Sequence, residues 1–311
     1  RKDIFLKMIS FLKKNFLVFV FFILIIELLK INNTLINDFY YPHIYKNVSN
    51  ILFFLFGNIP FSVGDIIYII IPLYIIIKLK NRYTRRRNFV FIIKTFAIIY
   101  IFFQLNWGLN YHNNNVINKL YGIEKYDFDQ LIKVTNLFVE KTNIIHNKLS
   151  KSDTIAADLN YNYELVFNES IKAVNNLDFD NKIYLPKQIK IKRSLFSTPL
   201  SYIGFSGYIN PFTLEAQINN NVPKLFMPVT TSHEISHLKG YAKENEANFI
   251  GILASVNSKN LFLSYSGNIQ ALRYLLDEVR KQDKKESQKI IQKINCLLYT
   301  SDAADEWRSG C

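Results

Sequence analysis

Three long apolar runs occupy the first third of the chain, at residues 16–26, 61–79 and 89–105. A bilayer core of about 30 Å needs about 20 mostly apolar residues in one helix. The first run reaches this length when residues 9–14 are included, because the side chains of Lys13 and Lys14 can extend to the interface. The pattern predicts an α-helical membrane anchor in residues 1–105, with three transmembrane helices at about 9–29, 61–79 and 89–105. A fourth run, 51–56, is too short to cross and predicts an interfacial or re-entrant helix.

Beyond the third run, the pattern becomes that of a folded domain. Apolar residues at helical spacing, with charges between them, predict helices at 128–149, 163–177, 229–239, 243–257, 269–281 and 286–295. Residues 188–193 alternate as a strand does, and two further strand-like segments flank Asn210-Pro211, which predicts a hairpin over 202–219. We therefore expect residues 106–295 to form an α+β domain that is mainly helical with a small antiparallel sheet.

The charge of the chain follows the same division. The 311 residues contain 38 Lys and Arg against 25 Asp and Glu, and residues 1–88 alone hold 13 basic and 4 acidic side chains. The basic residues lie before the first run and between 78 and 87, whereas residues 31–60 contain only Lys46. The positive-inside rule then places the N-terminus in the cytoplasm and everything beyond about residue 106 outside. The net charge of +13 thus reflects orientation in a lipid bilayer, and we expect no nucleic-acid partner.

The last sixteen residues differ in character from the rest. Residues 296–311 read CLLYTSDAADEWRSGC and contain both cysteines of the chain. The segment CLLYTSDAADE resembles the translation of a transposase-type sequencing adapter, so we interpret 296–311 as a non-native tail and exclude it from the chemistry. The chain also starts at Arg1 rather than at Met, and both ends are expected to be incomplete.

One motif points directly to chemistry, the sequence His233-Glu234-Ile235-Ser236-His237 on a predicted helix. Residues four apart lie on one face of a helix, so both imidazoles can bind one Zn²⁺ ion. Glu234 would then project beside the metal and act as a general base toward bound water. The motif predicts zinc as cofactor, with Glu234 as the catalytic residue.

A catalytic zinc site needs a third protein ligand and an open position. Two downstream glutamates compete for this role. Glu246 shares a helix stripe with apolar residues and is expected to point toward the core, where a buried carboxylate needs a cation. Glu244 shares its stripe with small and polar residues, a face that could be exposed to solvent. The simpler interpretation of Glu244 is a solvated carboxylate in the first turn of a helix. The sequence favours Glu246 as the third ligand, with Asn248 as a supporting residue.

Other residues could assist catalysis or substrate binding, but the sequence does not favour one of them over another. A tyrosine often stabilises the oxyanion in such sites, and Tyr208, Tyr241 and Tyr265 are candidates, although packing is the commoner role in a chain with 19 tyrosines. The hairpin before the motif offers a sheet edge that could hold an extended peptide by strand addition. Glu215 in that hairpin could contact substrate, but a surface carboxylate is the simpler reading.

The hairpin and motif, SYIGFSGYINPFTLEAQIN and MPVTTSHEISHLKGYAKENEANFIG, resemble a family of bacterial multi-pass membrane proteins of unknown function with a zincin-like metallopeptidase domain. The resemblance extends to PFSVGDIIY and WGLNY and so covers most of the chain. It implies zinc bound by His233, His237 and Glu246, with Glu234 catalytic. The family continues beyond the C-terminus of this chain, where further substrate contacts are expected.

These observations predict a zinc-dependent peptidase that hydrolyses peptides or proteins of the envelope on the outer face of the bacterial cytoplasmic membrane. The principal alternative is a non-catalytic zinc-binding scaffold of the envelope. A transporter is less favoured because no inverted repeat is visible. An intramembrane protease is excluded, since the segment around the motif is too polar to span a bilayer.

Overall fold

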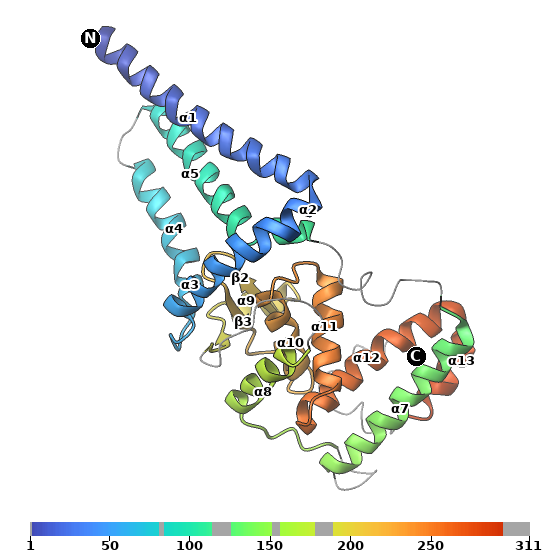
Figure 1. The fold of residues 1–311 in the computed structure, drawn as a ribbon. Helices are drawn as coiled ribbons and strands as arrows, with labels where there is room; N and C mark the ends of the chain where they lie inside the picture. The colour runs from blue at the N-terminus through green and yellow to red at the C-terminus, as the bar shows by residue number, and fades with distance from the viewer. Residues whose placement is uncertain (1, 81–83, 114–125, 151–155, 178–188, 295–311) are drawn as a thin grey trace. The chain divides into compact units, whose positions relative to one another are not determined.

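The computed structural model describes residues 2–80, 84–113, 126–150, 156–177 and 189–294, and the tail 296–311 lies outside the described residues. The chain divides into two compact units (Figure 1). Unit 1 comprises residues 1–115 together with the short segment 210–215, and unit 2 comprises residues 116–209 and 216–311. The segment 210–215 is the tip of the predicted hairpin, so a piece of the second half of the chain is built into the unit of the first half.

The described residues of segment 1–115 in unit 1 are mainly helical. Its long helices are α1 (Lys2–Ile31), α3 (Lys46–Phe56), α4 (Val63–Lys80) and α5 (Arg85–Asn106). Between α1 and α3 the chain forms a short helix α2 (Asn33–Leu35) and a π-helix η1 (Ile36–Tyr45), and a 3₁₀-helix η2 (Gly108–His112) follows α5. Tyr40 and Tyr45 of η1 are fully buried, and the Tyr40 hydroxyl donates to the carbonyl of Leu105 at 3.0 Å.

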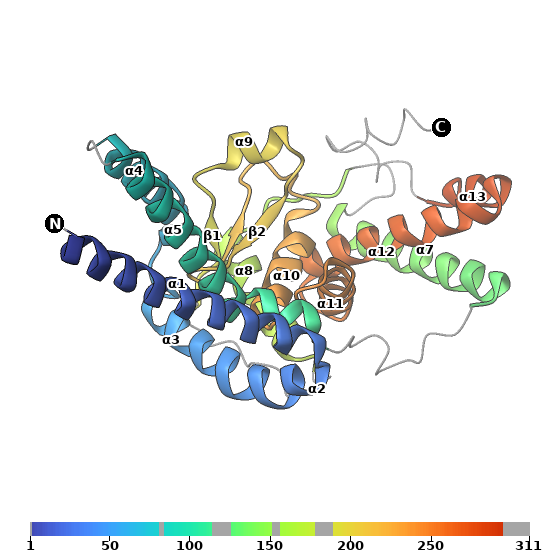
Figure 2. The same ribbon diagram turned by 90° about the horizontal axis from the view of Figure 1, so that it is seen from above.

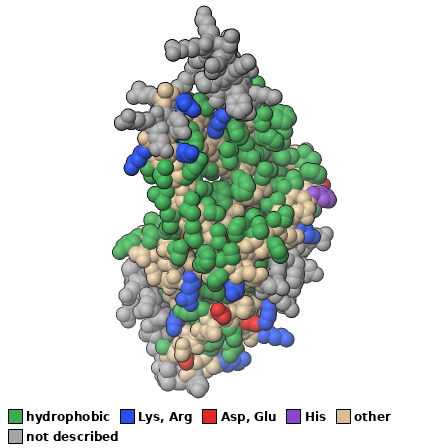
Figure 3. Space-filling view, turned by 90° about the vertical axis from the view of Figure 1, so that its left-hand side faces the viewer, with side chains coloured by type: hydrophobic (Ala, Val, Ile, Leu, Met, Phe, Trp, Pro, Cys, Tyr) green, Lys and Arg blue, Asp and Glu red, His purple; other side chains and the backbone are tan. Residues whose placement is uncertain are grey.

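The long helices of unit 1 expose apolar side chains rather than bury them. Figure 3 shows hydrophobic side chains gathered over one face. Exposed apolar side chains of the long helices include Phe21 at 60 %, Ile77 at 58 % and Phe96 at 64 %. A contiguous apolar surface of this kind marks contact with a membrane or another protein. This surface explains why the helices are apolar without forming the core of a water-soluble domain.

The prediction of three membrane spans is corrected by the structure. Among the described residues, one helix, Arg87–Asn106, is long and apolar enough to cross a bilayer, and a second span arises if Leu17–Ile31 and Asn33–Phe56 count as one. These two segments meet at a bend of 99°. Helix α4 is only 18 residues long and carries three charged residues, Asp65, Lys78 and Lys80. The uncharged apolar stretch between Asp65 and Lys78 is shorter than a bilayer crossing needs. The number of candidate spans is therefore one or two.

Unit 2 contains seven described helices, and six of them overlap the predicted ones, although α12 begins eight residues earlier than predicted. They are α7 (Phe128–Ser150), α8 (Tyr163–Asn175), α10 (Met227–Leu238), α11 (Glu244–Val256), α12 (Leu261–Gln282) and α13 (Lys284–Ile291). The seventh, α9 (Ser197–Tyr202), was not predicted. Helices α7, α12 and α13 share one apolar core cluster that includes Val139, Leu276 and Ile290.

The sheet has three short strands, β1 (Lys192–Arg193), β2 (Gly207–Asn210) and β3 (Glu215–Ile218), in the order β1-β3-β2. Strand β1 runs parallel to β3, with Lys192 opposite Gln217. The sheet is thus mixed, which corrects the prediction of an antiparallel one. Figure 2 shows α9 at one end of the strands, where it reverses the chain between β1 and β2. The hairpin reverses the chain a second time, so β3 runs in the direction of β1.

Candidate metal centre

Helix α10 carries the motif, and the residues at its two ends define where it begins and ends. Pro228 stands in its first turn, where a missing N–H costs nothing. At the other end the N–H of Gly240 donates to the carbonyl of His237 at 2.8 Å, and Gly240 has a φ of 91°, the left-handed region that glycine adopts without strain. Helix α10 therefore ends at Leu238, one residue before the end of the predicted helix 229–239. The chain then turns directly into α11.

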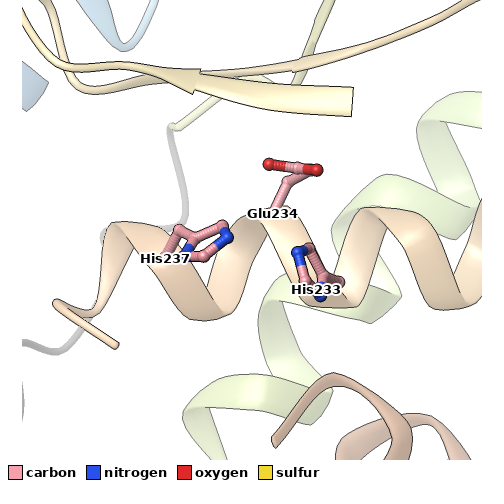
Figure 4. Close-up of side chains that lie close together, drawn as sticks. All are labelled: His233, Glu234 and His237. Carbon is pink, nitrogen blue, oxygen red and sulfur yellow. The ribbon is translucent and has the colours of Figure 1, made fainter. Parts of the chain in front are cut away.

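His233, Glu234 and His237 form a compact group. One potential ligand atom from each lies within 4.8 Å of the others. The two imidazole rings have centroids 4.7 Å apart and stand at 89° to each other. In Figure 4 the three side chains project from neighbouring turns of α10, with a strand passing over Glu234. The spacing of the motif thus produces the convergence that the sequence predicts.

The His237 imidazole is oriented by the backbone. Its Nδ1 lies 2.7 Å from the carbonyl oxygen of Tyr241. A carbonyl can only accept, so Nδ1 carries a proton and Nε2 is left as the atom that can bind a metal. This is the arrangement that fixes metal-binding histidines in proteins. Tyr241 therefore contributes to the site through its carbonyl group, whereas its side chain is 2 % exposed.

Glu244 contacts both imidazoles. Its Oε2 lies 3.2 Å from His233 Nε2 and its Oε1 lies 3.5 Å from His237 Nε2. Hydrogen bonds from His233 and then from His237 hold the pKa of Glu244 far below its ordinary value. Burial opposes protonation of His237, but the hydrogen bond with Glu244, the charges of Glu234 and Glu244 and the hydrogen bond with the Tyr241 carbonyl together raise the pKa of His237. The carboxylate and the two Nε2 atoms thus converge, although the Glu244 side chain is 71 % exposed.

The close packing of α11 against α10 brings Glu244 there. A β-carbon added at Gly251, two turns along α11 from Glu244, would lie 2.7 Å from the backbone nitrogen of His233. Ala247, between them on the same stripe, is fully buried, and Asn248 is partly buried. Glu246, which the sequence favours as third ligand, is 4 % exposed and is outside the compact group of ligand atoms.

Glu234 lies beneath strand β2. A β-carbon added at Gly207 would lie 2.7 Å from Glu234 Oε1, so only glycine leaves room for the carboxylate at this point of the strand. Glu234 is 4 % exposed, and its Oε2 has no hydrogen-bond partner among the described residues. Burial raises the pKa of Glu234, while His233 and His237 counteract this effect. A buried carboxylate oxygen without a partner is costly, and such an atom is expected where a ligand completes the site.

The two other tyrosine candidates have their hydroxyl groups engaged elsewhere. The Tyr265 hydroxyl lies 2.9 Å from His146 Nδ1 in the interior of unit 2, and burial raises its pKa. The Tyr208 hydroxyl lies 3.3 Å from Ser194 Oγ. These contacts give both side chains a structural role, and neither contact involves the metal-binding motif.

Glu215 is not a surface carboxylate. It is 3 % exposed and belongs to unit 1, where it accepts hydrogen bonds from the N–H groups of Val63 at 3.2 Å and Gly64 at 2.6 Å. The sequence gives no direct signal for this contact, because 151 residues separate Gly64 from Glu215.

Comparison with known families adds one assignment. The family model described as "Protein of unknown function (DUF3810)" matches residues 40–307, which is most of the chain. The chain belongs to the DUF3810 family. The predicted membership of an uncharacterised family is thus confirmed, while a zincin-like domain stays a prediction. No curated protein and no solved structure is significantly similar to the chain.

Proposed function

We propose that this DUF3810 protein is a membrane-anchored zinc peptidase that cleaves peptide bonds on the outer face of the bacterial cytoplasmic membrane. The observation that carries the proposal is the convergence of His233 Nε2 and His237 Nε2 on a carboxylate, beside a buried glutamate with an unpartnered oxygen. Two histidines four residues apart with an adjacent glutamate are the arrangement that binds zinc and supplies the general base in H-E-x-x-H metalloproteases. The exposed apolar helices of unit 1 support the membrane anchor.

The donor set fits zinc. Imidazole nitrogen and carboxylate oxygen are ligands that Zn²⁺ accepts, and three of them leave one position open for water. We assign His233, His237 and Glu244 as the ligands. Glu244 replaces Glu246 in this proposal because its two oxygens lie 3.2 and 3.5 Å from the two Nε2 atoms. The hydrogen bond from His237 Nδ1 to the Tyr241 carbonyl supports this assignment, because it leaves Nε2 as the nitrogen that can bind zinc.

The chemistry of hydrolysis is then assigned to Glu234. Bound zinc supplies a Lewis acid that lowers the pKa of water and polarises a carbonyl group. Glu234 takes a proton from the attacking water while the water oxygen bonds to the carbonyl carbon of the substrate. It then delivers that proton to the amide nitrogen as the C–N bond breaks. Its burial, which raises its pKa, suits a group that must hold this proton between the two steps.

The substrate is proposed to be an extended peptide segment. In the order β1-β3-β2, strand β2 is an outer strand, and its first residue, Gly207, lies against Glu234. An outer strand can pair with an added strand, which would bring a peptide backbone beside the general base. Length and sequence preference of the substrate are set by side chains along this edge.

The orientation rests on the flanks of α5. Arg85, Arg86 and Arg87 stand at its N-terminal end, and the positive-inside rule places such a flank in the cytoplasm. Residues beyond Asn106 would then be exported, and unit 2 with the metal centre would be outside. This argument depends only on α5, which among the described residues is the one helix that qualifies as a span by itself.

The test compares the full chain with its Glu234→Gln variant. We expect wild-type protein to contain about one zinc per chain and to cleave members of a peptide library. The variant should keep its zinc and lose hydrolysis, because an amide cannot accept the proton. Glu140→Gln, a change of an exposed carboxylate on α7, serves as control. Hydrolysis that survives in Glu234→Gln would refute the mechanism. Zinc without any hydrolysis in the wild type would favour the non-catalytic envelope scaffold.

A further inference from the structure

Two sequence segments that the metal centre does not use meet in unit 1. One is the turn before α4, within PFSVGDIIY, and the other is the hairpin tip 210–215. Glu215 accepts hydrogen bonds from the N–H groups of Val63 and Gly64, the first two residues of α4. Ser62 Oγ accepts from the N–H of Asp65 at 3.0 Å. Three N–H groups that a helix start leaves unpaired are thus satisfied, two of them by the hairpin.

The tip is held tightly to this helix start. The Thr213 hydroxyl donates to Glu215 Oε2 at 2.8 Å. The ring of Phe212 stacks on Phe102 of α5, with centroids 6.0 Å apart and an interplanar angle of 18°. A β-carbon at Gly64 would overlap the side chain of Asn210, so the two segments are in direct contact. The tip is therefore fixed by buried polar bonds as well as by apolar packing.

The conformation of the tip is enforced rather than relaxed. Leu214 has a φ of 49°, which is unfavourable for a residue with a branched side chain, yet it is 2 % exposed. Its N–H donates to the carbonyl of Asn210 at 2.8 Å, and Asn210 Oδ1 accepts from Phe212 and Thr213 at 2.9 and 3.2 Å. Strain of this kind persists only where surrounding contacts determine the backbone.

The same strand that enters this tip lies over the general base. Strand β2 runs from Gly207, whose position leaves room for Glu234 Oε1, to Asn210 at the tip. Only two residues separate these points, and a strand is too stiff and too short for its ends to move independently. The bonds that fix Asn210 and Glu215 therefore also restrict the backbone at Gly207.

We infer that Glu215 is a positioning residue: by fixing the hairpin tip on the N-terminus of α4, it holds β2 in place above the Glu234 carboxylate. This inference rests on the proposed peptidase function for its catalytic consequence. The restriction of β2 itself can be tested without activity.

The experiment uses the full chain in lipid nanodiscs and compares Glu215→Gln with Thr213→Val and with the exposed control Glu140→Gln. Hydrogen exchange of the segment 205–219, zinc content and hydrolysis are measured on each. For Glu215→Gln we expect faster exchange in this segment, unchanged zinc and a kcat lowered about tenfold to a hundredfold with little change in KM, as for a small displacement of a catalytic group. Thr213→Val, which leaves the carboxylate in place, should give the same pattern more weakly. Glu140→Gln should match the wild type.

The outcomes separate the possibilities. Unchanged exchange and unchanged kcat in Glu215→Gln would overturn the inference, and so would a loss of zinc in step with activity, since that pattern belongs to general unfolding. If Glu215→Gln does not fold, Thr213→Val decides by the same criteria. An inactive wild type would refute the proposed peptidase, while the exchange measurements would still show whether Glu215 restrains β2.

Discussion

At the position of the third ligand, the choice between Glu244 and Glu246 depends on which stripe of α11 faces α10. The stripe of Glu244 contains Ala247 and Gly251, which sequence reasoning takes for a solvent-exposed face because it lacks large apolar residues. In the structure these small residues allow close contact between the two helices, and Gly251 lies against the backbone of His233. A short turn after Gly240, followed by small residues at helical spacing, is the signal that would have placed Glu244 beside the two histidines.

This difference gives a prediction about zinc affinity. Glu244→Gln should weaken zinc binding by more than the roughly 10- to 100-fold that follows loss of an outer-shell partner, because it removes a proposed ligand. Glu246→Gln should retain zinc and lower stability instead, since Glu246 is 4 % exposed and a buried carboxylate is matched to its surroundings. Competition with a chromophoric chelator measures the first effect, and chemical unfolding measures the second. The reverse pattern would restore Glu246 as the ligand.

At the scale of elements, the regular helices of unit 2 follow from the sequence because each carries an apolar stripe at helical spacing. Helix α7 was predicted at 128–149 and spans Phe128–Ser150. Strand β1 was predicted at 188–193 and is limited to Lys192–Arg193 among the described residues, because only this part is aligned with β3. The π-helix η1 has no periodicity that distinguishes it from an α-helix. The hairpin was found, but its tip contacts were not, since they join residues distant in sequence.

The packing of α11 on α10 leads to a second prediction. In Gly251→Ala the new methyl group would lie 2.7 and 2.8 Å from the backbone of His233, where nothing flexible can move aside. The helices must separate, so we expect a stability loss of about 1–3 kcal/mol. Zinc affinity should fall as well, because Glu244 is carried by the same helix. Chemical unfolding and chelator competition on the detergent-solubilised chain measure these two quantities.

A matched control is available one helix further on. In Gly267→Ala the added carbon would lie 2.5 Å from Ser255 Cβ and 2.9 Å from the backbone nitrogen of Val256, at the opposite end of α11 from Glu244. This variant should lose comparable stability while zinc affinity changes little. Equal loss of zinc in both variants would show that general destabilisation, rather than the α10–α11 contact, governs the metal centre.

For the whole molecule, the number of spans and the orientation turn out to be separate questions. The sequence pattern predicts three spans, and the described helices provide one or two. Orientation of unit 2 needs only the last crossing, because a chain that passes through α5 with its arginine flank inside must emerge outside. The arginine flank of α5 gives the same orientation of unit 2 for one span or two, whereas the basic N-terminal flank lies on the same side as these arginines only if α5 is the single crossing.

This reasoning predicts the behaviour of topology reporters. A reporter enzyme that is active only when exported should be active when fused after Asn257, in unit 2, and inactive when fused after Lys80, before α5. Replacement of Arg85, Arg86 and Arg87 by asparagine should reduce the exported activity of the Asn257 fusion, because it removes the charges that retain this flank in the cytoplasm. Activity of the Lys80 fusion together with inactivity of the Asn257 fusion would reverse the orientation and place the metal centre in the cytoplasm.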